Sequence, residues 1–149
     1  MHDADKPFWE TKSLAAMSPE EWELLCDGCG RCCVNKLEDE DTEAVFFTSV
    51  ACRLLDANSC RCSRYRDRAK LVSDCIVLSP ERTADFRYLP RSCAYRRLFE
   101  GRGLAGWHPL ISGRADSVHE AGVSVRGRTI SESVVHPDDL QGHIVDWFD

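Results

Sequence analysis

Apolar and polar positions first combine into a recognisable element in the sequence SPEEWELL, which begins at Ser18. Ser18 offers the side-chain oxygen of a helix N-cap, Pro19 suits the first helical position, and a glutamate stands three residues after the cap. This spacing predicts a helix that runs to Leu25. It places Cys26 at the C-terminal end of that helix, where Gly28 can stop it.

The middle of the chain predicts one strand and two further helices. Residues 44–50 are apolar, β-branched and aromatic, which favours a strand or a short buried segment. Ser79 and the proline after it repeat the helix-start signal, and this helix should end before Pro90 because a proline disfavours helix in the residues before it. A short helix is expected from Ser92 to Phe99.

The last third of the chain carries weaker patterns. Residues 103–113 predict a loop anchored by Trp107. A loose alternation of apolar and polar positions over 122–130 predicts an exposed strand or hairpin. Residues 138–148 predict an amphipathic helix, which Gly142 weakens. Helices therefore predominate over strands, and the predicted fold class is α+β.

Length and composition fit a single helix-rich domain that spans residues 1–149. The chain is long enough to bury a core, and its 43% hydrophobic and 30% charged residues are ordinary for a globular protein. The sequence contains no internal repeat of solenoid period and no low-complexity tract, so neither a repeat architecture nor a disordered tail is indicated.

Charge is unevenly distributed along the chain, whose net charge is -6. The first 45 residues are acidic and residues 61–102 are basic, and the simplest interpretation is that the two regions complement each other. The acidic net charge argues against a nucleic-acid partner. The N-terminus holds charges rather than an apolar signal segment, and no apolar run approaches the roughly 18 residues of a membrane span. We therefore expect a cytoplasmic protein without membrane association.

Cysteines dominate the candidate chemistry. Four of them lie within residues 26–33, with glycines between them that allow a tight turn. An odd number of thiols cannot pair completely, and a reducing cytoplasm keeps thiols free, so metal binding or redox work is favoured over a disulfide scaffold. The nine positions are Cys26, Cys29, Cys32, Cys33, Cys52, Cys60, Cys62, Cys75 and Cys93.

The cysteine spacing leaves both zinc and iron open, because both metals bind thiolates. Cys26-x2-Cys29 matches one half of a tetrahedral zinc site, but Cys60-x-Cys62 is too closely spaced to match the second half comfortably. Cys26, Cys29 and Cys32 reproduce the C-x2-C-x2-C opening of a ferredoxin iron–sulfur motif. The fourth cysteine of that motif, followed by proline, is missing.

The adjacent pair Cys32 and Cys33 bears on the number of metal centres. Side chains of consecutive residues usually diverge, so we do not expect these two to serve one tetrahedral ion together. They can instead bridge a polynuclear centre or face two neighbouring centres. With the thiols between Cys52 and Cys75 there are enough ligands for two four-ligand sites or one multinuclear cluster. Residues 26–75 are therefore predicted to form a metal-binding core.

The cysteines and the residues around them resemble the CxxCxxCC cysteine-cluster family. The matching segments are CDGCGRCC from Cys26, CRLLD from Cys52, CSRYRDR from Cys62, and Cys75. The YcgN-type bacterial branch of that family continues through segments similar to CAYR from Cys93 and WHPL from Trp107. The resemblance covers nearly the whole chain and implies zinc or iron chelation. The ligands that it implies are Cys26, Cys29, Cys32, Cys33, Cys52, Cys62 and Cys75.

Two cysteines lie outside the shared pattern of the family. Cys60 is kept as an eighth candidate ligand, whereas Cys93, next to Ala94 and Tyr95 on a predicted helix, is interpreted as a core residue. His108, in a Trp-His-Pro sequence, is interpreted as a loop histidine satisfied by backbone groups. The other histidines lack paired ligand spacing.

Three functional classes follow from these observations. The favoured class is a non-catalytic protein that binds zinc or iron, with iron present as ions or as an iron–sulfur cluster. The second is an iron–sulfur or metal-dependent redox enzyme that uses the same centre. The third is a thiol oxidoreductase that uses Cys26 and Cys29 directly. No catalytic signature is present in the sequence, so no catalytic residue and no protein partner is assigned.

Overall fold

The computed structural model describes residues 6–72, 75 and 78–146 of the chain. Its α-helices are α1 (Phe8–Thr11), α2 (Pro19–Leu24), α3 (Arg68–Leu71), α4 (Ala94–Phe99), α5 (Pro109–Ser112) and α6 (Ser117–Glu120). Its 3₁₀ helices are η2 (Leu14–Ala16), η3 (Arg31–Cys33), η4 (Tyr65–Asp67), η5 (Pro80–Tyr88), η6 (Glu132–Val134) and η7 (Pro137–His143). Its strands are β1 (Val34–Glu38), β2 (Val45–Ala51) and β3 (Ile130–Ser131).

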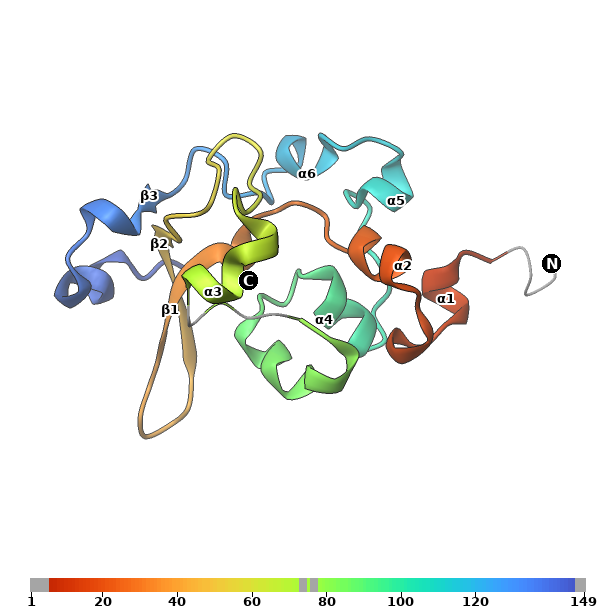
Figure 1. Cartoon of the computed structure of the whole chain (residues 1–149), viewed down its shortest axis with the longest axis horizontal. Helices are drawn as coiled ribbons and strands as arrows, with labels where there is room; N and C mark the ends of the chain where they lie inside the picture. Colours follow the sequence, from red (N-terminus) through yellow and green to blue (C-terminus); the bar gives the residue numbers. More distant parts are fainter. Residues whose placement is uncertain (1–5, 73–74, 76–77, 147–149) are drawn as a thin grey trace.

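These elements form a small α+β domain, which confirms the predicted fold class. Helices α1 and α2 lie toward one end of the molecule and the sheet lies toward the other, with α3 and α4 between them (Figure 1). In the sheet, β1 and β2 form an antiparallel hairpin, and β2 pairs in parallel with β3. Among the residues that the structure describes, no helix is long and apolar enough to cross a membrane.

Helix α2 forms where its capping signals predict it. Ser18 Oγ accepts the backbone N–H of Glu21 at 3.1 Å, and Glu21 Oε1 accepts the backbone N–H of Ser18 at 2.9 Å. This reciprocal pair satisfies two N–H groups that a helix start leaves without partners. The helix ends at Leu24, and the fully buried Leu25 then fixes the direction in which the chain enters the cysteine-rich segment.

The strand predicted over 44–50 is confirmed as β2, and its partner β1 follows directly on Cys33. No strong alternation in the sequence VNKLE marks β1, so its pairing with β2 was not predicted. Where the hairpin ends, the backbone N–H of Cys52 donates to the Cys33 carbonyl at 2.7 Å. The hairpin therefore brings two cysteines that are distant in the sequence to neighbouring positions.

Three small hydrophobic clusters make up the described core. The first consists of Leu25, Phe86, Leu89 and Tyr95, with Cys26 and Cys93 among the partly buried residues packed against it. The second consists of Val34, Cys60 and Val125. The third consists of Cys29, Val118 and Val123. Because cysteines take part in all three clusters, the core is built around the thiols rather than apart from them.

The exposed strand predicted over 122–130 is wrong. Only Ile130 belongs to a strand there, as the first residue of β3. Val123 and Val125 are buried in an irregular segment, and the Val125 N–H donates to the Cys29 carbonyl at 2.9 Å. The alternating apolar residues therefore reflect the burial of two valines against the cysteine-rich segment.

The amphipathic helix predicted over 138–148 is also corrected. The 3₁₀ helix η7 ends at His143, and the chain is extended after it. The Val145 N–H donates to the Phe47 carbonyl at 3.0 Å, so pairing with the β2 edge replaces further helical turns. The last two positions of the predicted helix lie outside the described residues.

The other predicted elements are present, although two of them differ in type from the prediction. The helix expected from Ser79 begins at Pro80 and ends before Pro90, but it is a 3₁₀ helix with a kink at Arg82. The helix expected from residue 92 is α4, with Cys93 as its N-cap. The loop predicted over 103–113 contains the short helix α5.

Candidate metal centre

Residues 26–33, which we call the knuckle, form a tight turn at the end of α2. Gly30 adopts a left-handed φ of 74°, a conformation that L side chains rarely take. A Cβ atom at Gly30 would lie 2.8 Å from Val125 Cγ2, so a larger residue would also collide with its neighbour. The Arg31 N–H donates to Cys29 Sγ at 3.4 Å, which fixes that sulfur over the turn.

Cys32 and Cys33 lie side by side in η3, and their sulfur atoms are 4.0 Å apart. The expectation that these two side chains diverge is therefore wrong. Two thiolates on one tetrahedral zinc ion stand about 3.8 Å apart, given zinc–sulfur bonds of about 2.3 Å. The pair can thus serve one ion or two adjoining centres, and its neighbours must decide between these arrangements.

The loop after β2 supplies two more thiols. Cys62 pairs with Leu55 in an isolated β-bridge, and the Ser63 N–H donates to the Leu54 carbonyl at 2.6 Å. The loop therefore folds back on itself. This brings Cys62 close to Cys52 at the end of the hairpin.

Helix α3 brings Cys75 to the same region. The Arg53 guanidinium, next to Cys52, donates to the carbonyl of Leu71 at the end of α3. The backbone N–H of Cys75 then donates to the Val72 carbonyl at 3.1 Å, forming a turn just beyond the helix. Cys75 is therefore held beside the loop that carries Cys52.

Cys93 reaches the knuckle from the opposite direction. Arg31 is buried, and its guanidinium donates to Ser92 Oγ at 3.1 Å and to the Val123 carbonyl at 2.6 Å. The bond to Ser92 holds the N-terminus of α4, where Cys93 is the N-cap, against η3. Cys93 packs against the hydrophobic core, as the sequence predicts, and in addition faces the same cavity as the other thiols.

All nine cysteines are free and line one cavity of about 550 Å³. The cavity also has cationic lining residues, Lys36, Arg61 and Arg68, and aromatic ones, Trp22, Tyr65, Tyr88 and Tyr95. Among the described residues, no three Cys, His, Asp or Glu side chains converge closely enough to hold a metal ion. The thiols therefore surround a shared space without forming a closed tetrahedron, and they must move inward to bind an ion.

Burial keeps several of these thiols neutral. Loss of water contact raises the pKa of Cys26 to about 11 and also raises the pKa of Cys29. Cys32 differs, because the hydrogen bond from the Cys33 thiol and the charge of Lys36 lower its pKa to about 7. The same hydrogen bond holds the proton on Cys33 and raises its pKa. The metal-free cavity thus combines a thiolate-prone Cys32 with neutral thiols.

Lys36 places a positive charge beside the two adjacent cysteines. Its Nζ donates to the Cys32 carbonyl at 2.9 Å and to the Val34 carbonyl at 3.0 Å. Burial lowers the pKa of this ammonium group, and the nearby thiols oppose that shift when they are ionised. A fixed ammonium here offsets part of the negative charge that several thiolates would bring together.

Asp27 ties the knuckle to the C-terminal half of the chain. Its buried carboxylate accepts the Cys29 N–H at 3.0 Å and the Trp107 indole N–H at 3.0 Å. This role could not be predicted from the sequence, because an acidic residue between two cysteines carries no sign of burial. The only available signal was its place inside the knuckle.

His108 braces the knuckle without being free to bind a metal. Its side chain is buried, and its Nε2 lies 2.7 Å from the Leu25 carbonyl. The Leu110 N–H donates to His108 Nδ1 at 3.0 Å, so the ring proton is on Nε2 and points to Leu25. Both ring nitrogens are therefore engaged, which confirms the interpretation of His108 as a histidine satisfied by the backbone.

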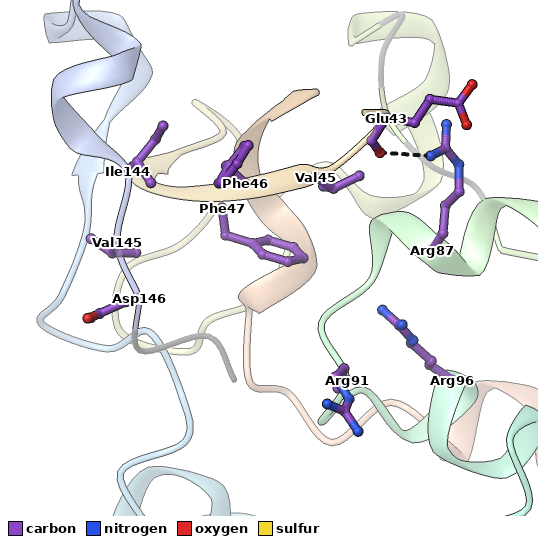
Figure 2. A pocket seen from close by; sticks show the side chains of 10 residues that line it. All are labelled: Glu43, Val45, Phe46, Phe47, Arg87, Arg91, Arg96, Ile144, Val145 and Asp146. Atoms are coloured by element: carbon purple, nitrogen blue, oxygen red, sulfur yellow. Dashed lines mark hydrogen bonds between the residues drawn. The ribbon is translucent and has the colours of Figure 1, made fainter. Parts of the chain in front are cut away.

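A second hollow, of about 920 Å³, lies beside β2 and contains no cysteine among its described lining residues. Figure 2 shows arginines on one side of it and apolar side chains of β2 and of the segment after η7 on the other. Arg87 donates to the Glu38 carboxylate at 2.6 Å, and Arg96 donates to Glu100 at 3.1 Å. Because two of its arginines already have anionic partners, this hollow is a weaker candidate than the thiol-lined cavity.

The fold and the cavity define the class of protein: a small α+β domain of the cysteine-cluster type. Residues 25–94 match the model of the CxxCxxCC family, which is described as a "Putative zinc- or iron-chelating domain". The chain belongs to this family, whose full-length relatives carry the name UPF0260 protein. The resemblance noted in the sequence is therefore confirmed.

The relatives cover nearly the whole chain. A UPF0260 protein of Gluconacetobacter diazotrophicus is 58% identical over 95% of this chain and 87% of its own length. UPF0260 proteins of Cellvibrio japonicus and Rhizobium etli are each 54% identical, over 97% and 96% of this chain and 98% and 90% of their own lengths. No solved structure gave a significant match.

Proposed function

We propose that this protein binds zinc or iron through thiolates of its cavity cysteines. The observation that carries the proposal is that free thiols from widely separated parts of the chain all line one cavity. The match to a family described as zinc- or iron-chelating supports it. The candidate ligands that the sequence names are Cys26, Cys29, Cys32, Cys33, Cys52, Cys60, Cys62 and Cys75.

The donor chemistry of the cavity fits both metals. Four thiolates suit a structural zinc ion, and four thiolates also hold an iron–sulfur cluster. His108 has both ring nitrogens engaged, so the buried histidine nearest the knuckle does not compete as a ligand. When bound, zinc would stabilise the fold, whereas an iron–sulfur cluster would also supply one-electron redox chemistry.

The cytoplasm is the compartment that suits this function. Nine unpaired cysteines remain reduced where glutathione and thioredoxin keep thiols free, and oxidising compartments would cross-link them. The negative net charge of the chain speaks against nucleic acid as a partner, so the metal is the partner we propose.

A redox enzyme that uses the same centre is the second candidate. The observation in its favour is the size of the cavity, since about 550 Å³ with aromatic side chains in its wall exceeds what a single ion requires. Trp22, Tyr88 and Tyr95 are among these aromatic residues. A small substrate could enter beside the metal, which a purely structural zinc site does not need.

Anaerobic purification, elemental analysis and an absorption spectrum test these proposals together. Iron with acid-labile sulfide and a broad visible absorption band would establish a cluster and favour the redox enzyme. Colourless protein with stoichiometric zinc would establish the zinc-binding alternative and exclude the cluster. Fully folded, metal-free protein that takes up neither metal would overturn metal binding altogether.

Replacing Cys29 by serine should remove metal and destabilise the domain. Cys29 is buried, and its sulfur accepts the Arg31 N–H inside the knuckle. Serine nearly preserves the volume but is a poor ligand for zinc or iron at neutral pH. We expect Cys29→Ser to be purified with clearly less metal per chain and with a lower melting temperature.

Val123→Ala is the matched control for this substitution. Val123 packs against Cys29 in the same buried cluster but offers no donor atom. It should lower the melting temperature through lost packing, by about 1–2 kcal/mol of unfolding free energy, while the folded protein keeps its metal. Unchanged metal content in Cys29→Ser would contradict the role of the knuckle.

A further inference from the structure

We propose that the cavity cysteines form two sets of four, each of which holds one metal centre, with Cys93 included and Cys60 excluded. The first set is Cys26, Cys29, Cys32 and Cys93. The second set is Cys33, Cys52, Cys62 and Cys75. This division rests on the proposed function of metal binding and specifies how the thiols share it.

The first set is assembled where the knuckle meets α4. Cys26 and Cys93 pack against the same hydrophobic cluster, so the two side chains approach the cavity from a common support. The Arg31 guanidinium bonds to Ser92 Oγ, which fixes the N-terminus of α4 to the turn between Cys29 and Cys32. Arg31 therefore holds Cys93 next to the part of the knuckle that carries Cys29 and Cys32.

The second set is assembled where the hairpin ends. Cys33 and Cys52 are joined by a backbone hydrogen bond of 2.7 Å. The bridge between Leu55 and Cys62 turns Cys62 back toward Cys52. The contact from Arg53 to the end of α3 then holds Cys75, which follows that helix, beside the segment that carries Cys52. The contacts that hold this set, two between backbone groups and one from the Arg53 side chain, do not involve α2 or α4.

The two sets meet at the adjacent sulfurs of Cys32 and Cys33, which are 4.0 Å apart. Lys36 sits at this junction, because its Nζ bonds to the carbonyls on either side of Cys33. Two centres of four thiolates each would bring their excess negative charge together here. The ammonium group lies where that repulsion would be largest.

Each set also has an arginine of its own. The Arg61 guanidinium lies against Gly28, and its charge lowers the pKa of Cys26, although burial outweighs it. The Arg68 charge acts in the same direction on Cys75. Positive charge is therefore distributed to both sets and to the junction.

Cys60, an eighth candidate ligand from the sequence, falls outside both sets. Its side chain is buried in a cluster with Val34 and Val125. The polar group that most affects its thiol is Ser124 rather than another cysteine. We assign Cys60 to the core, where it packs against Gly30 at a distance that leaves no room for an added Cβ.

The test is the number of Zn²⁺ ions per folded chain, counted by native mass spectrometry after anaerobic reconstitution. The wild type should bind two ions. Cys93→Ser and Cys62→Ser should each bind one, because each removes a ligand from a different set. Cys60→Ser, the matched control at a buried cysteine, should still bind two.

Each other outcome has a distinct meaning. Two ions retained in Cys93→Ser, or one lost in Cys60→Ser, would overturn the division. One ion in the wild type would also overturn it, while leaving metal binding intact. Wild-type protein that binds no Zn²⁺, and no iron when reconstituted with Fe²⁺ and sulfide instead, would overturn the proposed function.

A measurement on the wild type guards against variants that fail to fold. Protein loaded with ¹¹³Cd²⁺ should show two cadmium resonances of all-sulfur coordination in its NMR spectrum. A single resonance, or a resonance with nitrogen or oxygen ligands, would contradict two sets of four thiolates.

Discussion

At the scale of single residues, two neighbouring thiols in η3 differ in how easily they lose a proton. The two sulfurs share a hydrogen bond, in which Cys33 is the donor once Cys32 is ionised, and this bond lowers the pKa of Cys32 to about 7 and raises that of Cys33. Because the thiolate is the nucleophile, Cys32 should be the more reactive of the two at neutral pH in metal-free protein. The difference in pKa depends on the hydrogen bond between the two thiols, so a substitution of Cys33 that removes this bond should also remove the difference.

Cys33→Ala should raise the pKa of Cys32 toward the ordinary thiol value of about 8.5. The hydrogen bond that favours the thiolate is lost, so more alkaline conditions are needed to ionise Cys32. Alkylation of Cys32 by iodoacetamide at pH 7 should then slow by roughly tenfold, and the midpoint of its rate against pH should move upward. Mass spectrometry of the labelled, metal-free protein measures this rate.

Cys33→Ser is the control, because serine keeps a hydroxyl that can donate to the Cys32 sulfur. It should retain most of the fast reaction at pH 7. If Cys33→Ala kept the same midpoint as the wild type, the lowered pKa of Cys32 would need another cause.

At the scale of elements, a helix or strand was predictable where its sequence signal lies within a few neighbouring residues. The Ser18 cap predicted α2, and the β-branched run predicted β2, because each depends on local geometry. The segment 122–130 was not predictable in the same way. Val123 and Val125 alternate like strand residues, yet they are buried against the knuckle by contacts with residues far earlier in the chain. Local alternation reports burial here and not strand pairing.

The ends of α2 and α5 are joined by His108. Its Nε2–H donates to the Leu25 carbonyl after α2, and its Nδ1 accepts an N–H at the start of α5. His108→Ala should leave both backbone groups without partners and open a cavity, which should cost about 3 kcal/mol of unfolding free energy. Urea unfolding of the purified variant measures the loss.

The metal content of folded His108→Ala should equal that of the wild type, because the histidine acts as a brace and not as a ligand. His136→Ala, at an exposed histidine, should change stability far less. Loss of metal from well-folded His108→Ala would show that the imidazole does coordinate the ion.

At the scale of the whole molecule, the candidate ligands could be predicted from the sequence, but the residues that hold them in position could not. Cysteine spacing is readable because thiols themselves are the ligands. The braces are ordinary residues such as Asp27, Trp107 and His108, and their partners lie about eighty residues away. Only the folded chain brings them together. The predicted core of 26–75 therefore depends on a segment beyond it, which includes Trp107 and Val125.

Removal of metal should loosen both regions. Chelation should lower the melting temperature, because a ligand present at about 100 times its Kd stabilises the folded state by about 2.7 kcal/mol. Amide hydrogen exchange should accelerate in residues 26–75 and also in 105–125, since the Val125 N–H bonds to the Cys29 carbonyl. Exchange followed by mass spectrometry resolves the two regions.

The protein with Cys29→Ser serves as the comparison for this experiment, because chelator should change it little once its metal is already reduced. Acceleration confined to 26–75 in the wild type would show that the C-terminal segment does not depend on the metal.

The hydrogen bond from the Arg31 side chain to the Val123 carbonyl spans 92 positions of the sequence, so it can form only after Val123 has been synthesised. A ribosome adds roughly 5–20 residues per second, so the knuckle emerges on the order of ten seconds before the segment that braces it. During that interval its four cysteines are on the nascent chain without their support. Cells that make this protein must therefore keep these thiols reduced until the last third of the chain has left the ribosome.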